Sequence, residues 1–468
     1  MIGDALGPAA KDNEGGNQWL YWLLFCFAAI HALLLTLDAR YPSAFMRADR
    51  ATDRMAAIDA LHALGDWQAI VAYLGSHGNI GDYAPQGLLY LVGGKLTLVV
   101  CQICLMLLSG VCVFRLARLC ELSARASCVA TALYLGSPHS LALPHQLAAE
   151  ALFVPLVAIS TWATAEAVRR SNQVVLSYSG LLLGIANLVR PVALVWPIVV
   201  VFGLRRFSSA RTGPLIFAAA AYLPILVWIV FVWQETGTPG MGESDHSVAV
   251  NLYGRVEAIA ATMPPDERGA VTAQYLAGEH KNELSPLKYL SFAAHYPLPL
   301  LIYAVRDTEI FLFKSGIERI TVDYLTNEQQ AKPLQIRNGD GWRQRWDKYG
   351  ALAAMRYGWQ VLGITFLISA LGAAVQVALI LLAVVGAVQV VRLLKHHAAS
   401  AASKLAEFLV LALPIYFLIF SQLADATQSR HRAPAEFALA ILATHGVLRV
   451  RSAWRARTTR RQSQTATC

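Results

Sequence analysis

The chain has 468 residues, of which 56% are hydrophobic and only 15% charged, and its mean hydropathy is +0.46. A soluble domain is roughly 45–50% apolar and about 25% charged, so this composition excludes an ordinary soluble enzyme. The formal charge of +9 is carried largely by short linkers and the C-terminal tail, which favours contact with anionic lipid headgroups over nucleic-acid binding.

Long apolar runs follow one another along the chain, and crossing a bilayer takes about 20 apolar residues in a helix. In chain order the predicted spans are 18–37, 92–116, 126–144, 147–167, 174–189, 191–204, 213–233, 362–392, 405–423 and 433–450. The pair 174–189 and 191–204 is divided at Arg190-Pro191, because an arginine fits a helix end better than mid-bilayer. The sequence therefore predicts an all-α polytopic membrane protein of about ten transmembrane helices.

The charged residues between the runs predict the orientation. With ten spans, every short basic linker falls on one side together with the basic tail, and the acid-containing loops 38–91 and 234–357 fall on the other. Short basic linkers stay in the cytoplasm. We therefore expect 1–17 to be a cytoplasmic N-terminus, 18–450 the transmembrane domain, and 451–468 a cytoplasmic tail. The first run is too long for a signal-peptide core, which predicts a retained signal anchor.

Both outer loops contain apolar segments. In 53–75, Met55, Ile58, Leu61 and Leu64 recur at helical spacing, which indicates an amphipathic helix on the membrane interface. Residues 286–305 are apolar and contain two prolines, and they are read either as a surface helix or as a re-entrant hairpin.

Arginines gather at the outer side of this topology. Arg190 ends one span, while Arg430 and Arg432 open the last one. Arginine is a permanently charged, bidentate donor that suits a phosphate headgroup. These three residues are therefore the predicted phosphate-binding set, and the alternative is that each one snorkels to the interface.

Further polar residues lie at the same depth, and they complete the list of candidates. Glu150 lies just inside the outer end of its span, Glu436 lies one turn below Arg432, and His145 lies at a helix mouth; Tyr83 belongs to the segment that leads into the second span. Ionisable residues in a membrane are costly and tend to be functional.

The first outer loop supplies candidate bases. Asp49 follows the first span closely, and a carboxylate facing an arginine-bound phosphate can act as general base for an acceptor. The alternative is a solvated loop acid or a helix cap. No His, Cys, Asp or Glu cluster has firm metal-ligand spacing, and no nucleotide-binding fingerprint is present. No cofactor is firmly indicated, and a divalent metal is left open.

Four short motifs, in order along the chain, carry a family resemblance. They are Ala48–Asp53 with the amphipathic segment after it, Tyr83–Gly87, Gly184–Pro191 and Arg430–Pro434. Together they resemble the GT-C superfamily of membrane glycosyltransferases. The similarity is to bacterial members of the dolichyl-phosphate-mannose protein mannosyltransferase and aminoarabinose transferase type, which are glycosyltransferase family 39-like.

The resemblance implies a polyprenyl-phosphate sugar donor and an inverting transfer on the periplasmic face of the bacterial inner membrane. The acceptor would be a protein, lipid A or another glycan. It also implies a catalytic Asp in the first outer loop, which by position is Asp49. Many relatives have a second acid directly after it, where this chain has Arg50. Asp53 is therefore a rival base, and a metal role stays open.

Two other functions remain in view. A transporter or flippase of lipid-linked sugars would account for many helices and buried charges, but it predicts inverted repeats, which the sequence does not display. A glycan polymerase or ligase with a diphosphate-linked donor would rely on loop arginines instead of the first-loop acid. Substitution of Asp49 and Asp53 separates the transferase from the polymerase, and an uptake assay separates it from a transporter.

Overall fold

In a computed structural model of the chain, the structure describes residues 8–40, 45–46, 55–56, 58–59, 63, 80–208, 210–237, 239–241, 243–277, 284–313, 364–395, 399–421 and 429–465. All regular elements in these ranges are helices. The all-α polytopic architecture predicted from composition and hydropathy is confirmed.

The helices of the membrane bundle are α1 (Pro8–Arg40), α4 (Ile80–Leu119), α5 (Ala124–Leu135), α6 (Pro138–Ala142), η2 (Leu143–His145), α7 (Glu150–Arg170), α8 (Gln173–Val189), η3 (Pro191–Ala193), α9 (Trp196–Phe207), α10 (Gly213–Thr236), α19 (Ile364–Lys395), α20 (Ala401–Ser421), η6 (Ser429–Ala435) and α21 (Glu436–Thr465). Seven helices in the described ranges, namely α1, α4, α7, α10, α19, α20 and α21, are long and apolar enough to cross a membrane. The predicted count of about ten also included the runs that form α5, α8 and α9, which have 12, 17 and 12 residues.

The predicted span 126–144 is not one helix, and this prediction was wrong. Gly136 ends α5, and the side chain of Ser137 then accepts a hydrogen bond from the backbone of Ser140 at the start of α6. Pro138 occupies the first position of α6, where proline's missing N–H costs nothing. Glycine, serine and proline in succession therefore end one helix and begin another.

The predicted division at Arg190-Pro191 is confirmed. Arg190 is extended, with φ −146° and ψ 112°, and it follows the last residue of α8. A residue before proline is pushed out of the helical region, because the proline ring clashes with its backbone. The short η3 then turns the chain into α9.

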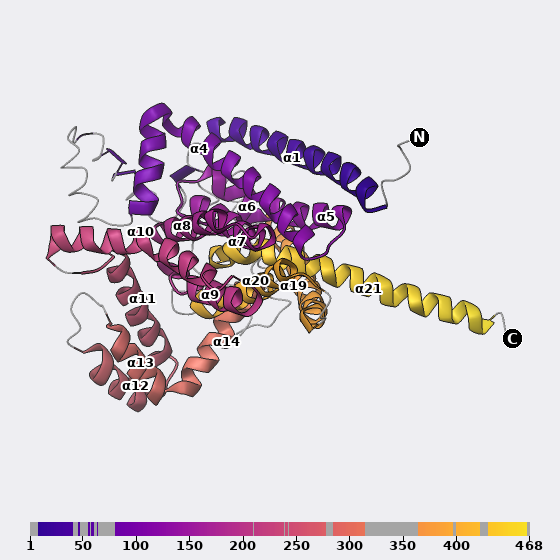
Figure 1. Cartoon of the computed structure of the whole chain (residues 1–468). Coiled ribbons are helices and arrows are strands. Elements are labelled where there is room, and N and C mark those ends of the chain that lie inside the picture. Colours follow the sequence, from indigo (N-terminus) through magenta and orange to yellow (C-terminus); the bar gives the residue numbers. More distant parts are fainter. Residues whose placement is uncertain are drawn as a thin grey trace.

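The bundle has two distinguishable ends (Figure 1). One end contains the C-termini of α1 and α8 and the N-termini of α7 and α21. We call it the loop end, because the long segment between α10 and α19 leaves and re-enters the bundle there. At the other, which we call the basic end, α4, α7, α9 and α19 finish in arginines and lysine. Beyond it α21 projects from the bundle as a single helix, so the predicted basic tail is helical to Thr465.

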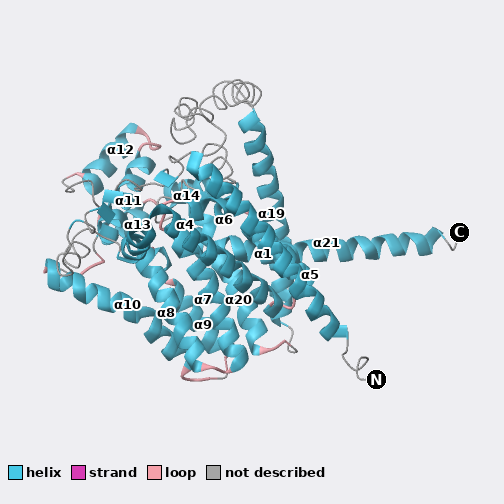
Figure 2. Ribbon diagram, turned by 90° about the horizontal axis from the view of Figure 1, so that it is seen from above, coloured by secondary structure: helices cyan, strands magenta, loops and turns pink. Residues whose placement is uncertain are grey.

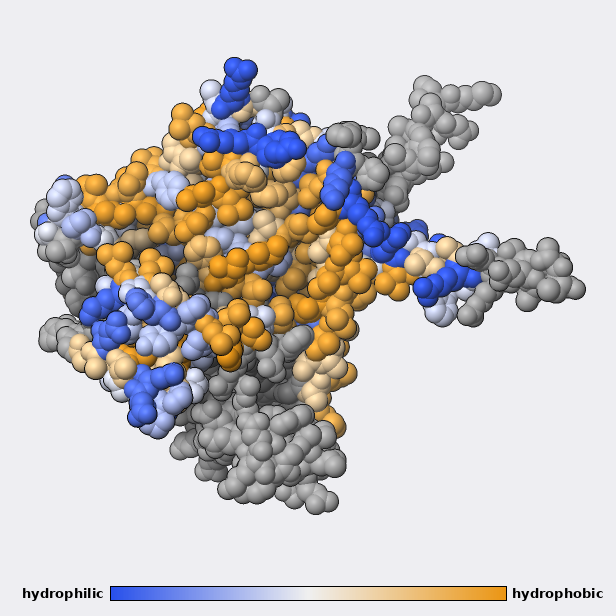
Figure 3. Space-filling view, turned by 90° about the horizontal axis from the view of Figure 1, so that it is seen from below, coloured by the Kyte–Doolittle hydropathy of each residue, from blue (hydrophilic) through white to orange (hydrophobic). Residues whose placement is uncertain are grey.

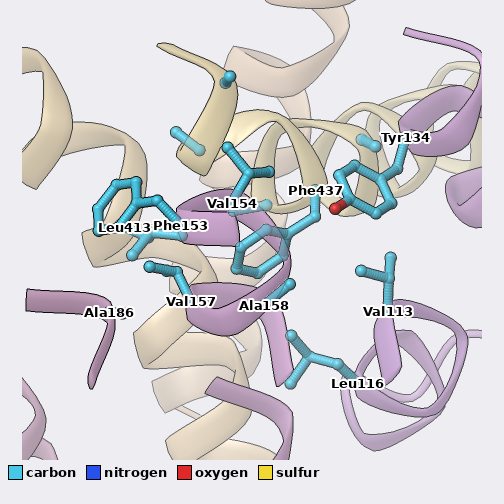
Figure 4. Packing of buried hydrophobic residues seen from close by; sticks show 14 of the residues in the cluster. Val113, Leu116, Tyr134, Phe153, Val154, Val157, Ala158, Ala186, Leu413 and Phe437 are labelled. Atoms are coloured by element: carbon cyan, nitrogen blue, oxygen red, sulfur yellow. The ribbon is translucent and has the colours of Figure 1, made fainter. Parts of the chain in front are cut away.

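Aromatic and aliphatic side chains fill the centre of the bundle (Figure 4). Tyr134 meets Phe437 edge-on with ring centroids 6.2 Å apart, and Phe153 meets Phe417 at 6.1 Å. The outward surface of the bundle is also apolar, whereas the projecting end of α21 is hydrophilic (Figure 3). An apolar exterior around an apolar core is what a protein solvated by lipid requires.

Four of the described elements that follow α10 pack together: α11 (Glu243–Ala260), α12 (Pro265–Val271), a π-helical turn (Thr272–Leu276) and α13 (Pro286–His295). They share a small hydrophobic core of their own that includes Phe292. α14 (Pro297–Phe313) then packs against α19 and η6. The segment expected to be a surface helix or a hairpin thus forms two helices, α13 and α14. Of the predicted interface helix 53–75, most lies outside the described residues, and Ile58 is buried against the main core.

Candidate functional site at the loop end

Residues 137–150, which link α5 to α7, form the connecting segment of the loop end. They comprise Ser137, α6, η2 and the turn before Glu150, and from His139 onward nearly every side chain is buried. Gln86 of α4 donates a hydrogen bond to the carbonyl of Ala148 over 2.9 Å, and the backbone N–H of Leu147 donates to the carbonyl of Phe45 over 3.1 Å. The segment therefore has a fixed place between α1, α4 and α7.

The first polar contact joins the connecting segment to α1. His145 has no exposed surface, and its Nδ1 lies 2.6 Å from Oδ2 of Asp38 at the end of α1. Its other ring nitrogen, Nε2, lies 2.9 Å from Nδ1 of His31, which precedes Asp38 in α1 by about two turns. The two rings stack with centroids 5.2 Å apart. The result is a buried carboxylate–imidazole–imidazole chain, the kind of arrangement through which protons pass.

The second contact joins the connecting segment to α21. Nδ1 of His139 lies 2.7 Å from Oε1 of Glu436, the first residue of α21, and both side chains are buried. Nε of Arg432, in η6, lies 3.4 Å from the same oxygen, and its Nη1 donates to the carbonyl of Leu312 in α14 over 3.1 Å. The last span is therefore tied both to the bundle and to the helix that returns from the small outer core.

The third contact is an ion pair between Glu150, at the start of α7, and Arg190, at the end of α8. The carboxylate is buried, while the arginine side chain keeps 22% of its surface exposed. Near the other end of α7, Glu166 pairs with Arg169 and Arg170, whose side chains are more than half exposed. Glu150 and Glu166 are 16 residues apart, or about 24 Å along the helix, so the two pairs mark opposite ends of the bundle.

These contacts set what the loop end can do chemically. It holds two histidines against carboxylates, where proton transfer is favourable, and one partly exposed guanidinium, which can receive an anion. All three contacts use one residue of the connecting segment: His139, His145 or Glu150. In the described part of the chain, no group of three or more His, Cys, Asp or Glu residues is arranged to hold a metal ion.

The structure brings five predicted residues together. Glu150 pairs with Arg190, and Arg432 pairs with Glu436. His145 lies in the connecting segment, which also contains Glu150 and His139, the partner of Glu436. The candidate bases Asp49 and Asp53 lie outside the described residues. Arg430 and Tyr83 are described in their backbone only, within η6 and α4, so their roles stay predictions.

Sequence reasoning missed His31, Asp38 and His139. His31 is an isolated polar residue in the first apolar run, and Asp38 is the acid that ends it. A signal was present, because an ionisable residue inside a membrane span is a functional candidate by default. His139 lay inside a run that was read as one continuous span.

Comparison with known proteins supports the membrane location of the chain. A family model described as a predicted membrane protein (DUF2079) matches residues 52–263, from the first loop into α11. The match covers the connecting segment, α7 and α8, but less than half of the chain. No match was found among curated proteins. The chain is thus a multi-pass membrane protein, similar over these residues to a family of predicted membrane proteins.

Proposed function

We infer that the chain is a membrane glycosyltransferase. It moves a sugar from a polyprenyl-phosphate donor to a glycan, lipid or protein acceptor, with inversion, at the periplasmic face of the bacterial inner membrane. The observation that carries the proposal is the gathering of three buried polar contacts on one short segment at the loop end. The four motifs that resemble the GT-C superfamily support it, and two of them contain Arg190 and Arg432.

Donor binding in this proposal begins at Arg190. Its side chain is partly exposed and already oriented by Glu150, so an incoming phosphate oxygen can add to the guanidinium fork without displacing the carboxylate. Arg432 has no exposed surface and serves Glu436 and the carbonyl of Leu312. In the proposal Arg432 therefore adds positive charge beneath the phosphate, while Arg190 makes the direct contact.

Transfer requires an acceptor oxygen to lose its proton as the bond from the anomeric carbon to the phosphate oxygen breaks. A positioned carboxylate contributes about a hundred- to ten-thousand-fold to such a step. Asp49 is the proposed base, and Asp53 is its rival. Asp38 lies eleven residues before Asp49 along the chain and is held by His145. It anchors the end of α1 from which the first loop departs.

The test uses the purified full-length protein in liposomes with a radiolabelled polyprenyl-phosphate sugar and a membrane extract as acceptor source. We expect the wild type to transfer label, and Asp49→Asn to lose about 99% of the rate or more while still binding donor, because a general base contributes at least about a hundredfold. The matched control is Asp266→Asn, the same change at an exposed acid of α12. If both Asp49→Asn and Asp53→Asn transferred label at the wild-type rate, the assignment of the base would be wrong.

Donor affinity has its own matched pair. Arg190→Gln removes the charge from the loop end, and Arg169→Gln removes an arginine that also pairs with a glutamate of α7, at the basic end. A hydrogen bond to a charged group contributes about 1.5–3 kcal/mol, so Arg190→Gln should weaken donor binding roughly ten- to a hundredfold. Equal donor binding by the two variants would contradict the placement of the phosphate.

A transporter of lipid-linked sugars remains the alternative, because buried ionisable residues also occur in transporters. The same liposomes separate the two functions. Transferase activity converts the donor to free polyprenyl phosphate and a labelled product, whereas transport moves intact donor across the bilayer. Movement of intact donor without release of the carrier would overturn the proposal.

A further inference from the structure

A cavity of about 330 Å³ lies between α5, α19 and α21, beside the second polar contact of the loop end. The residues that line it come from the close of α5, the start of α6, the first half of α19 and the start of α21. Nearly all are apolar, and its volume is within the range of about 300–1,000 Å³ that ligand pockets occupy. Three membrane helices thus leave room for a guest molecule.

The crossing of α19 and α21 explains why this space exists. The two helices touch at Gly386 and Gly446, where an added Cβ would overlap the backbone carbonyl of Leu442 or of Leu382. Small residues allow membrane helices to approach this closely. The cavity lies on the loop-end side of that contact, between residues 368–380 of α19 and the first residues of α21. α19 stands at the margin of the bundle (Figure 2), and few of its residues are buried.

The cavity opens toward the bilayer. Leu371 and Val375 of α19 line it and are 67% and 51% exposed. Both lie in the part of α19 before Arg392, which carries no charged residue and is apolar apart from a few polar side chains such as Gln376, so the medium that reaches the opening is lipid hydrocarbon and not water. A molecule that enters must therefore already reside in the membrane and bring an apolar chain.

The inner end of the cavity is polar. Glu436 lines it, although the residue is only 8% exposed. Oε1 of Glu436 lies within hydrogen-bond distance of His139 and Arg432, and the Ser137 hydroxyl, which also lines the cavity, interacts with the same carboxylate. Oε2 has no partner at hydrogen-bond distance among the described residues. A buried carboxylate oxygen without a donor is costly, and a guest that donates one hydrogen bond would satisfy it.

We propose that this cavity binds a lipid alcohol, with the hydrocarbon chain between α19 and α21 and the hydroxyl donating to Oε2 of Glu436. A hydroxyl supplies the single donor that one oxygen can use, whereas an ammonium group brings three donors and a full charge into an apolar pocket. A phosphate is excluded from direct contact with this oxygen, because both would be anions.

The proposal rests on the proposed function in one respect only. Glu436 shares Arg432 with the donor region, so the bound alcohol would lie beside the sugar donor. To serve as its acceptor, the hydroxyl would turn its proton from Oε2 of Glu436 to the first-loop base. The acceptor class would then be a membrane lipid with a free hydroxyl. Binding of the alcohol does not depend on transfer, and the two are measured separately.

The test is photocrosslinking of the full-length protein in nanodiscs with a long-chain alcohol that carries a diazirine. The matched probe is its methyl ether, which keeps the chain but cannot donate. We expect the alcohol to label the wild-type segments 368–380 and 436–440 at least about tenfold more efficiently than the ether, as one hydrogen bond to a carboxylate implies. Glu436→Leu should reduce this preference to near parity.

Two variants of α19 separate the cavity from the rest of the lipid-facing surface. Gly372→Trp fills the cavity and should abolish labelling by both probes. Leu381→Trp adds the same side chain at a position that is 63% exposed and outside the cavity, and it should label as the wild type does. Size-exclusion chromatography and thermal unfolding confirm that each variant is folded.

The outcomes are distinguishable. Equal labelling of wild type by alcohol and ether, or undiminished labelling of Gly372→Trp, would overturn the site. If an equimolar aminolipid reduced labelling by the alcohol probe and a second, unlabelled alcohol did not, the assignment of a hydroxyl as the bound group would be wrong. If the alcohol binds as described but receives no sugar in the transfer assay, the site stands and its role as acceptor site in the proposed function fails.

Discussion

The substitution His145→Ala tests whether the connecting segment holds the loop end together. The imidazole of His145 is fully buried and bridges Asp38, 2.6 Å from its Nδ1, and His31, 2.9 Å from its Nε2. Alanine cannot make either hydrogen bond, and it leaves a space of roughly one ring between α1 and the start of α7. Asp38 would keep a buried carboxylate without this partner.

The expected magnitude follows from these contacts. A hydrogen bond to a charged group contributes about 1.5–3 kcal/mol and one between neutral groups about 1 kcal/mol. Removal of one partner from a buried ionic pair costs about 3–5 kcal/mol, because the remaining charge stays buried. We therefore expect His145→Ala to lower the free energy of unfolding by about 3–5 kcal/mol, which the lost hydrogen bonds and the vacated space together account for.

The assay is denaturant- or heat-induced unfolding of the detergent-purified protein, compared with His295→Ala. His295 is an exposed histidine of α13; its Nδ1 lies 2.8 Å from the carbonyl of Ser291, and its ring centroid lies 6.5 Å from that of Tyr275. A surface substitution of this kind changes stability by less than about 0.5 kcal/mol. If His145→Ala and His295→Ala had the same free energy of unfolding, the contacts of His145 with Asp38 and His31 would contribute nothing to stability, and the reasoning would be refuted.

Two further predictions concern the framework. A reporter fused after Lys395 should be cytoplasmic and one inserted within 243–260 should be periplasmic, as alkaline phosphatase and fluorescent fusions can measure; both on one side would contradict the topology. Gly386→Ala should lower the free energy of unfolding by about 1–3 kcal/mol, because its Cβ overlaps the carbonyl of Leu442, whereas Gly269→Ala, with open space around it, should not. Equal stability of the two alanine variants would show that α19 and α21 can separate without cost.

Much of the fold could be predicted from sequence, because membrane helices depend on local composition. An apolar run of about 20 residues has few alternatives to a helix in lipid. The break at Arg190-Pro191 could be predicted for the same reason, since proline acts on its immediate neighbour. These rules need no knowledge of distant contacts, and the seven long apolar helices among the described residues follow them.

The candidate site could be predicted only in part, because its contacts are long-range. His145 lies 107 residues from Asp38 and 114 from His31, and His139 lies 297 residues from Glu436. Each of these residues appears alone in its own apolar stretch, where nothing local names its partner. The glutamates and arginines were recognisable as outliers of charge, whereas the pairing of Glu150 with Arg190 needed the packing of α7 against α8.

The prediction of 126–144 as one span failed because hydropathy does not register caps. Gly136, Ser137 and Pro138 interrupt the run with little change in its mean apolarity, yet together they end a helix and start another. The residues after the break are as buried as a span would be. They are buried inside the protein, however, and not within lipid.

The two ends of α7 carry buried glutamates in different surroundings, and the comparison bears on the role of the buried charges at the loop end. Both Glu150 and Glu166 are buried, but Glu166 is neutralised by arginines that remain more than half exposed, at little cost in desolvation. At the loop end Glu436 and Asp38, the partners of His139 and His145, are themselves enclosed. A buried ionic pair is seldom more stable than well-packed apolar side chains of similar volume, so stability alone does not account for it. The loop end thus holds buried acids and histidines with one buried and one partly exposed arginine, beside a cavity that opens to lipid, and this arrangement supports the proposed chemistry on a membrane-borne substrate.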